Sequence, residues 1–483
     1  MPEAVHMRSA SRDAGSGATS SGATSSGAAG SGAAGSDARR WTLVATSLGF
    51  SVVQLDVSIV NVAIKSIGGG LGGGVSGLQW VVNAYTIAFA ACILTAGSIA
   101  DRIGARRLFV GGFLLFMTAS AVCGLAPDLG VLVGARGVQG LAAALLVPSS
   151  LALLSHAYTD DRARTHAIGI YLAGASIALS GGPLIGGALI ASIGWRAIFF
   201  INVPVAVCGV LLTLRFANET TRSAARGVDL RGQIAAIATL ALLVGATIEG
   251  GVRGFTSTAV LAGYAAALAC GFAFVAFEAR GRSPMLPLSL FASRTFSASS
   301  LAGLLVNTAF YGLIFVISLF FQRVQGLSPL TTGFALAPVM IGITASNIAS
   351  GWMQHRFGAT RVLAAGALLL AAACAGMLGA GTHTAYAAIV VQLTALGAGA
   401  GMVVPTVTAE VLSSVPRNRS GVAGGTLNTL RQTGSAIGVA LFGSLLARGD
   451  GFVPGVHASF AIAVGLALAV AALAPLLRVR ARD

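Results

Sequence analysis

The feature that most constrains this chain is its supply of apolar segments. Runs of about 20 predominantly apolar residues, the length that a helix needs to cross a bilayer, recur along most of its 483 residues. Charged residues make up only 9% of the chain, whereas a soluble domain carries about 25%. So few charges could not cover a globule of this size in water, but they suffice for a body whose sides face lipid. The sequence therefore predicts an all-α protein that crosses a membrane many times.

About fourteen runs have the required length, and the run from Gln233 to Ile248 is the weakest of them. They begin near Trp41, Gln79, Leu108, Leu129, His166, Ala197, Gln233, Ser257, Phe296, Thr331, Val362, Ala385, Val422 and Val456.

The basic residues predict the orientation, because cytosolic loops carry an excess of arginine and lysine. With both termini in the cytosol, the inner loops and tails collect about 23 basic residues. The outer loops receive only five, which are Lys65, Arg196, Arg253, Arg323 and Arg448. If one span had been missed, all later loops would change sides and the asymmetry would be lost. The asymmetry therefore supports the count of fourteen. We expect a multi-pass protein of the plasma membrane with both termini in the cytosol.

The chain also repeats itself. The loop Gly97–Arg107 follows the second run, and the similar Gly351–Arg361 follows the tenth, which indicates two homologous halves. The first residues are rich in glycine, alanine and serine and lack large apolar side chains, so they cannot offset their ordering entropy. The expected organisation is a disordered cytosolic tail (1–40), a six-helix bundle (41–216), an inserted two-helix hairpin with flanking loops (217–294) and a second six-helix bundle (295–478).

Several classes of protein are disfavoured. The net charge of +15 is spread in small groups between apolar runs, unlike the basic stripe of a nucleic-acid-binding protein. The five cysteines fall inside apolar runs without CxxC spacing, as expected of buried thiols. The chain has no GxxxxGK[ST] loop and no His/Cys cluster, so we expect no enzymatic activity, no cofactor, no metal and no nucleic-acid partner. If the protein moves a solute, an ion gradient should drive it.

Six motifs occur in order along the chain, each on a matching run. They are Leu55–Ile64, Gly97–Arg107 (GxxxDRxGRR, with Ala105 where a basic residue is also common), Arg136–Gly140 (RxxQG), Gly174–Gly187 (GxxxxxxGGPxxGG), Trp195–Pro204 and Gly424–Gly434. Together they resemble the major facilitator superfamily, specifically its fourteen-helix drug:proton antiporter branch. Ile248–Gly250 and the general layout are also similar to antibiotic self-resistance exporters of the methylenomycin type.

This resemblance implies a major facilitator fold, with two six-helix bundles and two inserted helices. It implies a proton-coupled antiporter that exports small hydrophobic compounds, such as drugs or antibiotics, by alternating access. An exporter or importer of a specific metabolite, such as an amino acid or a sugar, is the alternative with the same fold. A receptor or membrane-integral enzyme fits less well with the repeated halves. The expected partners are a small-molecule substrate, protons and the lipid bilayer, and the expected state is a monomer.

Asp56 is the most informative single residue. Counting from Trp41 places it about 22 Å into the membrane, where a carboxylate is costly and usually functional. The other acids lie in loops, in tails or near helix ends, so Asp56 is the best candidate for the proton carrier. Arg136 lies at a similar depth, and pairing the two charges is cheaper than burying them apart. A purely structural ion pair between the first and fourth helices is the alternative.

A third buried charge, Arg431, lies about 14 Å from the cytosolic side. It could face the cavity and contact substrate, or be satisfied by backbone carbonyls and Gln432. Together with a neutralised Asp56, a cavity-facing Arg431 should favour neutral or weakly charged substrates over dications. The candidate substrate-binding residues are Asn83, Tyr85, Gln139, Asn307, Tyr311 and Arg431.

Two motifs suggest how the halves move. The resemblance assigns Asp101, Arg102, Gly104, Arg106 and Arg107 to an inner gate, in which the acid contacts the helix that starts near Gly421. Setting the topology alone is the alternative for these charges, and His355 replaces the acid in the second half. The glycines of the fifth helix permit close packing and its proline permits a bend, with or without a role in coupling. These residues are Gly174, Gly181, Gly182, Pro183, Gly186 and Gly187.

Overall fold

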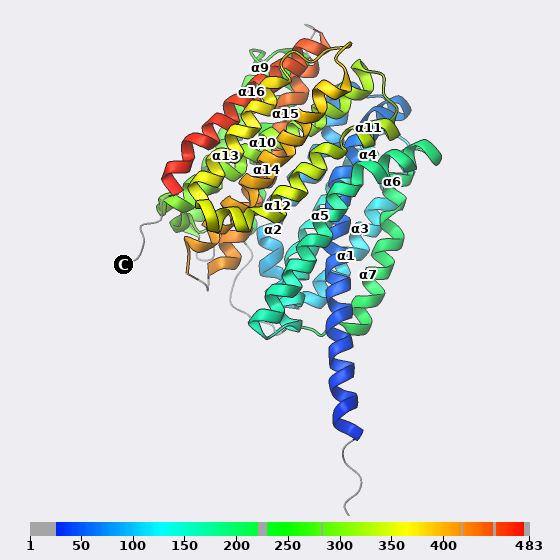
Figure 1. Ribbon diagram of the computed structural model, residues 1–483, viewed down its shortest axis with the longest axis vertical. Coiled ribbons are helices and arrows are strands. Elements are labelled where there is room, and N and C mark those ends of the chain that lie inside the picture. Colours follow the sequence, from blue (N-terminus) through cyan, green and yellow to red (C-terminus); the bar gives the residue numbers. More distant parts are fainter. Residues whose placement is uncertain (1–25, 221–228, 282–283, 417–418, 448–450, 478–483) are drawn as a thin grey trace, which may run out of the picture.

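Helices account for nearly all of the structure, a computed structural model that describes residues 26–220, 229–281, 284–416, 419–447 and 451–477 (Figure 1). No strand occurs among these residues. The α-helices are α1 (Ser26–Leu71), α2 (Gly74–Ile103), α3 (Ala105–Leu125), α4 (Leu129–Ala157), α5 (Asp161–Ser192), α6 (Ala197–Phe200), α7 (Asn202–Phe216), α8 (Leu230–Arg253), α9 (Thr258–Arg280), α10 (Arg294–Leu319), α11 (Pro329–Ala335), α12 (Ala337–Phe357), α13 (Ala359–Gly376), α14 (Tyr386–Ser413), α15 (Ser420–Ala447) and α16 (Phe452–Leu473). A π-helical turn, η2 (Phe320–Val324), continues α10.

Among the described residues, thirteen helical stretches have the length and hydropathy to cross a bilayer. α6 and α7 together form one of them, Ala197–Phe216, and α11 and α12 together form another, Pro329–Phe357. α15 is a further helix of 28 residues, and its hydropathy is lower because it carries Asn428, Arg431 and Gln432. The prediction of about fourteen spanning helices is confirmed.

The start of α1 corrects one expectation. Residues 26–40 were expected in a disordered tail, but α1 begins at Ser26 and they are helical. Adding a turn to an existing helix costs much less than nucleating one, and the apolar part of α1, Asp37–Leu71, supplies that nucleus. The alanines of this stretch are strong helix formers. Residues 1–25, also expected to be disordered, lie outside the described part of the chain.

The spanning helices form two bundles of six. α1 packs on α4, α5 and α7, while α4 also packs on α2 and α3. In the second bundle α10 packs on α14, α15 and α16, α12 packs on α14, and α13 packs on α14 and α16. The two extra helices, α8 and α9, pack on each other, and α8 also contacts α2 and α15. The hairpin is thus attached to one helix of each bundle, and the expected fold class is confirmed.

The two bundles are held together most closely at one end. Ser318 Oγ at the end of α10 donates to the Asn61 carbonyl of α1 at 2.7 Å. Gln322 Nε2 donates to the Val62 carbonyl at 3.0 Å, and Lys65 Nζ donates to the Gln322 carbonyl at 2.6 Å. These bonds lie at the end of the molecule opposite the α2–α3 and α12–α13 loops. That end of the seam between the bundles is closed.

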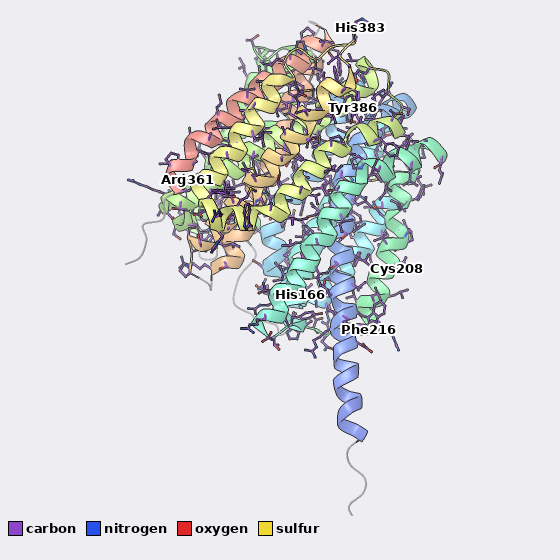
Figure 2. The ribbon with its side chains drawn as sticks, in the orientation of Figure 1. His166, Cys208, Phe216, Arg361, His383 and Tyr386 are labelled. Carbon is purple, nitrogen blue, oxygen red and sulfur yellow. The ribbon has the colours of Figure 1, made fainter. Side chains whose placement is uncertain are left out.

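Toward the other end the bundles separate, as Figure 1 shows for α5 and α12. Ser180 of α5 and Thr344 of α12 share a hydrogen bond of 2.9 Å. One turn further along the same face of α12, Ile348 is 80% exposed. Ala173, two turns before Ser180, is also exposed. The structure is therefore open toward the end with the α2–α3 loop, where His166 and Phe216 lie in Figure 2, opposite His383 and Tyr386.

Candidate functional site

An ion pair lies inside the first bundle, about midway along the spanning part of α1. Arg136 Nη1 of α4 donates to Asp56 Oδ2 of α1 at 2.5 Å, and the two side chains are 1% and 0% exposed. The structure thus brings together the two charges that, from the sequence, were expected to lie at a similar depth in the membrane. Removing either ion from water costs several kcal/mol, and the contact offsets much of that cost. The pair is neutral as a unit.

Amide side chains complete the shell of the carboxylate. Gln139 Nε2 and Asn202 Nδ2 both donate to Asp56 Oδ1, at 2.9 and 3.2 Å. Gln139 Oε1 in turn accepts from Arg136 Nη1 at 2.7 Å. Ser120 Oγ accepts from Gln139 at 2.8 Å and from Asn202 at 3.4 Å. Charge-assisted bonds of this kind are stronger than bonds between neutral groups, so the network fixes the Asp56 carboxylate firmly between α1, α4 and α7.

The guanidinium of Arg136 is held by α2 as well. Its Nε donates to the Val81 carbonyl at 3.1 Å, and its central carbon lies 4.3 Å from the centre of the Tyr85 ring. Such cation–π contacts are stronger when both partners are desolvated. A Cβ at Gly140 would overlap the backbone of Tyr85, so glycine is needed for α4 to approach α2 this closely. Arg136, Gln139 and Gly140 of the RxxQG motif thus have separate tasks at one helix crossing.

The network contains two residues that the sequence did not single out. Ser120 is an ordinary serine within an apolar run. Asn202 lies in the Trp195–Pro204 motif, and the sequence pattern alone assigned no role to its residues. Gln139 was expected to line the substrate site, but it is 0% exposed and bonded to the ion pair. Its contacts place it with the ion pair and not at a surface that a substrate could touch.

Arg431 lies on α15 and Tyr311 on α10, two helices of the second bundle that pack on each other. Both are partly exposed although they lie near the middle of α15 and α10. Arg431 makes no ion pair within the described part of the chain, and its Nε has no hydrogen-bond partner there. Of the two alternatives for Arg431, this position favours the one in which it faces the cavity.

The two asparagines expected at the substrate site lie differently. Asn307 Nδ2 donates to the Gly303 carbonyl one turn back on α10, at 2.8 Å, and Asn307 is 4% exposed. Asn83 is 0% exposed, and both polar atoms of its amide lack a partner among the described residues. It lies one turn beyond Gln79, which donates to α15 carbonyls at 2.7 and 3.0 Å, so it faces the α2–α15 contact.

The expected gating loop is bound to the end of α7 instead of to the other bundle. Gly104 has a φ of +99°, which a side chain would oppose, and it turns the chain between α2 and α3. Arg106 Nη2 donates to the Leu214 carbonyl at 2.5 Å, and its backbone N–H donates to Glu219 Oε1 at 2.9 Å. Arg107 pairs loosely with Glu219, at 3.8 Å. Glu219 was not singled out from the sequence.

Asp101 and Arg102 are exposed in this structure. Asp101 has no ion pair or hydrogen bond with the described residues, so the expected contact with the start of α15 is absent. α2 and α15 approach each other near this end, since a Cβ at Gly425 would lie 2.9 Å from Leu94, but Asp101 lies about two turns further along α2. His355 in the corresponding loop of the second bundle is also exposed.

The glycines of α5 face two different helices. A Cβ at Gly182 would overlap Ser58, and one at Gly186 would lie 2.6 Å from Ile59, both on α1. A Cβ at Gly187 would lie 2.8 Å from the backbone of Leu330 in α11 of the other bundle. The backbone of Pro183 also contacts α11, where it lies against Gly333. Gly174 has ordinary contacts with α1, and Gly181 only with a side chain of α5 itself.

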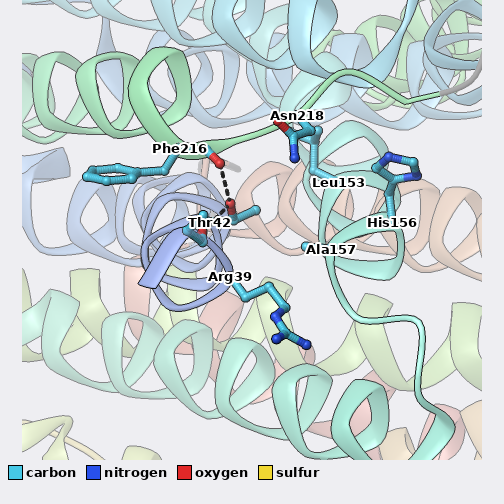
Figure 3. Close-up of a pocket in the computed structure, with 8 residues that line it drawn as sticks. Arg39, Thr42, Leu153, His156, Ala157, Phe216 and Asn218 are labelled. Carbon is cyan, nitrogen blue, oxygen red and sulfur yellow. Dashed lines mark hydrogen bonds between the residues drawn. The ribbon is translucent and has the colours of Figure 1, made fainter. Parts of the chain in front are cut away.

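A small cavity of about 170 Å³ opens at the end with the α2–α3 loop, between α1, α4 and the end of α7 (Figure 3). Thr42 Oγ1 crosses it to donate to the Phe216 carbonyl at 3.2 Å. Drug-sized ligands occupy pockets of about 300–1,000 Å³, so this cavity is too small to hold such a ligand. It is lined by Ala38, Arg39, Thr42, Leu153, His156, Ala157, Phe216 and Asn218.

Two helical bundles, a buried charge pair and an interior open at one end define a secondary membrane transporter. Comparison with known proteins gives the family. A model of the Major Facilitator Superfamily matches residues 46–439 and, in a second match, residues 300–483. The chain belongs to this superfamily, as its motifs indicated.

Individual proteins of known name that resemble this chain are more specific than the superfamily match. The chain is 37% identical to Multidrug resistance protein Stp of Mycobacterium tuberculosis (strain CDC 1551 / Oshkosh), over 84% of this chain and 75% of that protein. It is 35% identical to the Methylenomycin A resistance protein of Streptomyces coelicolor, over 88% and 89% of the two chains. The expected similarity to methylenomycin-type exporters is therefore confirmed.

The fold has solved counterparts at low sequence identity. A bacterial homologue of the human lysosomal transporter Spinster superposes with a TM-score of 0.63 and 18% identity, over 91% of this chain and 97% of that one. At this identity the likeness supports the fold and says nothing of the substrate.

Proposed function

We propose that this protein exports small hydrophobic compounds, such as drugs or antibiotics, across the plasma membrane in exchange for protons. The relatives named for drug and antibiotic resistance support the direction and the kind of substrate. The observation that carries proton coupling is the buried Asp56–Arg136 pair, because an ionisable residue inside a membrane-spanning helix is expected to be functional and a carboxylate can bind and release a proton. We further propose that the protein acts as a monomer with both termini in the cytosol.

The mechanism uses the pair as a switch. With Asp56 ionised, Arg136 and the two amides hold α1 against α4 and α7. Protonation removes the charge that Arg136 pairs with, which loosens these contacts and leaves a neutral carboxyl. Release of the proton on the other side of the membrane restores the pair. Each protonation state then favours one orientation of the bundles, and substrate moves in the opposite direction.

α1 offers a route from this switch to the closed end. Ser58 and Ile59, one turn beyond Asp56, pack on Gly182 and Gly186 of α5. One turn further, the carbonyls of Asn61 and Val62 accept the bonds from α10 that hold the bundles together. A shift of α1 that follows the charge of Asp56 would act directly on those bonds.

Asp56→Asn tests the proposal in proteoliposomes that hold the full chain and carry an imposed pH gradient. The variant keeps an acceptor for Gln139 and Asn202 but can no longer gain or lose a proton, so gradient-driven efflux of a fluorescent hydrophobic compound should be abolished. Asp128→Asn is the matched control, because Asp128 caps α4 at its exposed end and asparagine caps equally well. Wild-type coupling in Asp56→Asn would refute the assignment. A drug-susceptibility panel in an efflux-deficient host would identify substrates.

A further inference from the structure

Arg431 leaves the interior with an unbalanced positive charge. Asp56 and Arg136 neutralise each other, whereas Arg431 has no ion pair among the described residues. The stem of Arg431 passes over Gly303 of α10, where a Cβ would lie 3.4 Å from its Cγ. A cation in the middle of a membrane protein is costly unless a partner compensates it. In this structure the protein does not supply that partner from its described residues.

Two tyrosines lie on the helices that pack against the helix of Arg431. Tyr85 belongs to α2 and Tyr311 to α10, and both of these helices pack on α15, which carries Arg431. The Tyr85 ring lies on Arg136, while its hydroxyl is buried and has no hydrogen-bond partner among the described residues. Tyr85 itself is 1% exposed. Buried hydroxyls are normally bonded, so this one is available to an acceptor that the protein does not provide.

We propose that Arg431, Tyr311 and Tyr85 bind the anionic group of the exported compound, so that the substrates are hydrophobic monoanions such as aromatic carboxylates and ionised phenols. This proposal rests on the export function above and adds the class of substrate. A guanidinium binds a carboxylate through two parallel hydrogen bonds, and the hydroxyls can donate to its remaining lone pairs. The complex would be neutral inside the membrane, whereas a cationic compound would meet a like charge.

The same geometry links substrate to the proton site. Tyr85 would touch the anionic group of the substrate with its hydroxyl and Arg136 with its ring. A substrate that moves Tyr85 therefore changes the contacts of the guanidinium that holds Asp56. The first bundle contributes Tyr85 to the site, and the second contributes Tyr311 and Arg431. Occupancy of the site therefore depends on how the two bundles are placed relative to each other.

The test is a binding experiment with the full chain in lipid nanodiscs, using a panel of aromatic carboxylic acids paired with their primary amides. We expect the wild type to bind the acids at least tenfold more tightly than the amides. Arg431→Gln should abolish that preference and keep amide binding, and Arg431→Lys should retain part of it, because lysine keeps the charge without the fork. Arg323→Gln, which removes an exposed arginine at the closed end, is the matched control and should bind like the wild type.

Equal affinity for acid and amide in the wild type would overturn the proposal, and so would an equal loss of both in a folded Arg431→Gln. Should Arg431→Gln not fold, Tyr311→Phe carries the test and should weaken acid binding about three- to tenfold without affecting amides. Export is measured separately with the same pairs in proteoliposomes. Gradient-driven efflux without acid preference would leave the export function standing and refute the anion site. Acid preference without gradient-driven movement would support the site and refute proton-coupled export.

Discussion

At the scale of single residues, Asp56 depends on donors from three positions of two other helices. Arg136 and Gln139 come from α4 at a spacing of three, which places both on the face that meets α1. Asn202, the first residue of α7, supplies the third donor. A purely structural ion pair between α1 and α4 would need only the arginine as the partner of Asp56. The two amides instead donate to Oδ1 while Arg136 donates to Oδ2, so both carboxylate oxygens are bonded, which is the arrangement expected where the charge of the acid matters.

Gln139→Leu should therefore lower proton-coupled transport by about tenfold or more. A hydrogen bond to a buried charge contributes about 1.5–3 kcal/mol, and leucine also removes one hydrogen-bond partner from Ser120 and one from Arg136. Efflux from proteoliposomes at a fixed pH gradient is the measurement. Thr118→Val, on the lipid-exposed face of α3, is the control and should transport normally. Normal transport in Gln139→Leu would show that the amide only fills space.

The sequence predicts some of this site and hides the rest for a physical reason. Asp56 and Arg136 stand out because a charge within an apolar run has an obvious cost, and counting residues gives their depths. Ser120 and Asn202 carry no such cost, since a small hydroxyl or amide is common in a membrane helix. Their roles depend on which faces of α3 and α7 meet α1, and that is set by packing between distant segments. Glu219 is similar, because only the fold brings it to the start of α3.

At the scale of helices, hydropathy located the spans well, and their internal breaks less well. The spans starting near Ala197 and Thr331 are each built of two helices, and no apolar pattern marks the break between them. α15 shows the opposite problem. Its polar residues lower its hydropathy, but the alternation of inner and outer loops requires a spanning helix at this position. α5 shows what a motif means in space, because neighbouring glycines on it serve different helices.

Gly187→Ala should weaken the closed end of the seam. Its methyl group would lie 2.8 Å from the backbone of Leu330 and Pro329, which cannot rotate away as a side chain could, so α11 must move. We expect faster leak of substrate through proteoliposomes in the absence of a gradient. Gly181→Ala is a close match on the same helix, with only an ordinary 3.6 Å contact to Ile185, and should behave as the wild type. Equal leak from both variants would argue against a specific α5–α11 seal.

Glu219→Ala should destabilise the first bundle by about 1 kcal/mol, the usual cost of losing a helix cap. Its carboxylate accepts from the backbone of Arg106 at the start of α3, and the contact with the exposed Arg107 adds little. A lower midpoint of thermal unfolding in detergent would show the effect. Asp101→Ala provides the comparison, since Asp101 has no partner among the described residues and its removal should leave the midpoint unchanged. A midpoint unaffected in Glu219→Ala would mean that the cap contributes nothing.

At the scale of the whole molecule, the structure shows one of the two states that alternating access requires. The bonds from α10 to α1 close one end, while Ile348 and Ala173 lie exposed on facing helices toward the other. Ile348→Cys, in a background without the native cysteines, should react quickly with a membrane-impermeant maleimide added from the side of the α2–α3 loop. Ser318→Cys at the closed end should stay unlabelled in the same state, because Ser318 is 0% exposed.

Asp101 determines how this labelling should change. It has no partner among the described residues while this end is open, so we expect its contact with the start of α15 to form when this end closes. Removing the carboxylate should therefore destabilise the state that is closed at this end and shift the population toward the open one. Asp101→Ala should accelerate labelling of Ile348→Cys under conditions, such as an imposed proton gradient with substrate, that slow it in the wild type. An identical labelling rate with and without Asp101 would mean that these charges set the topology and take no part in the gate.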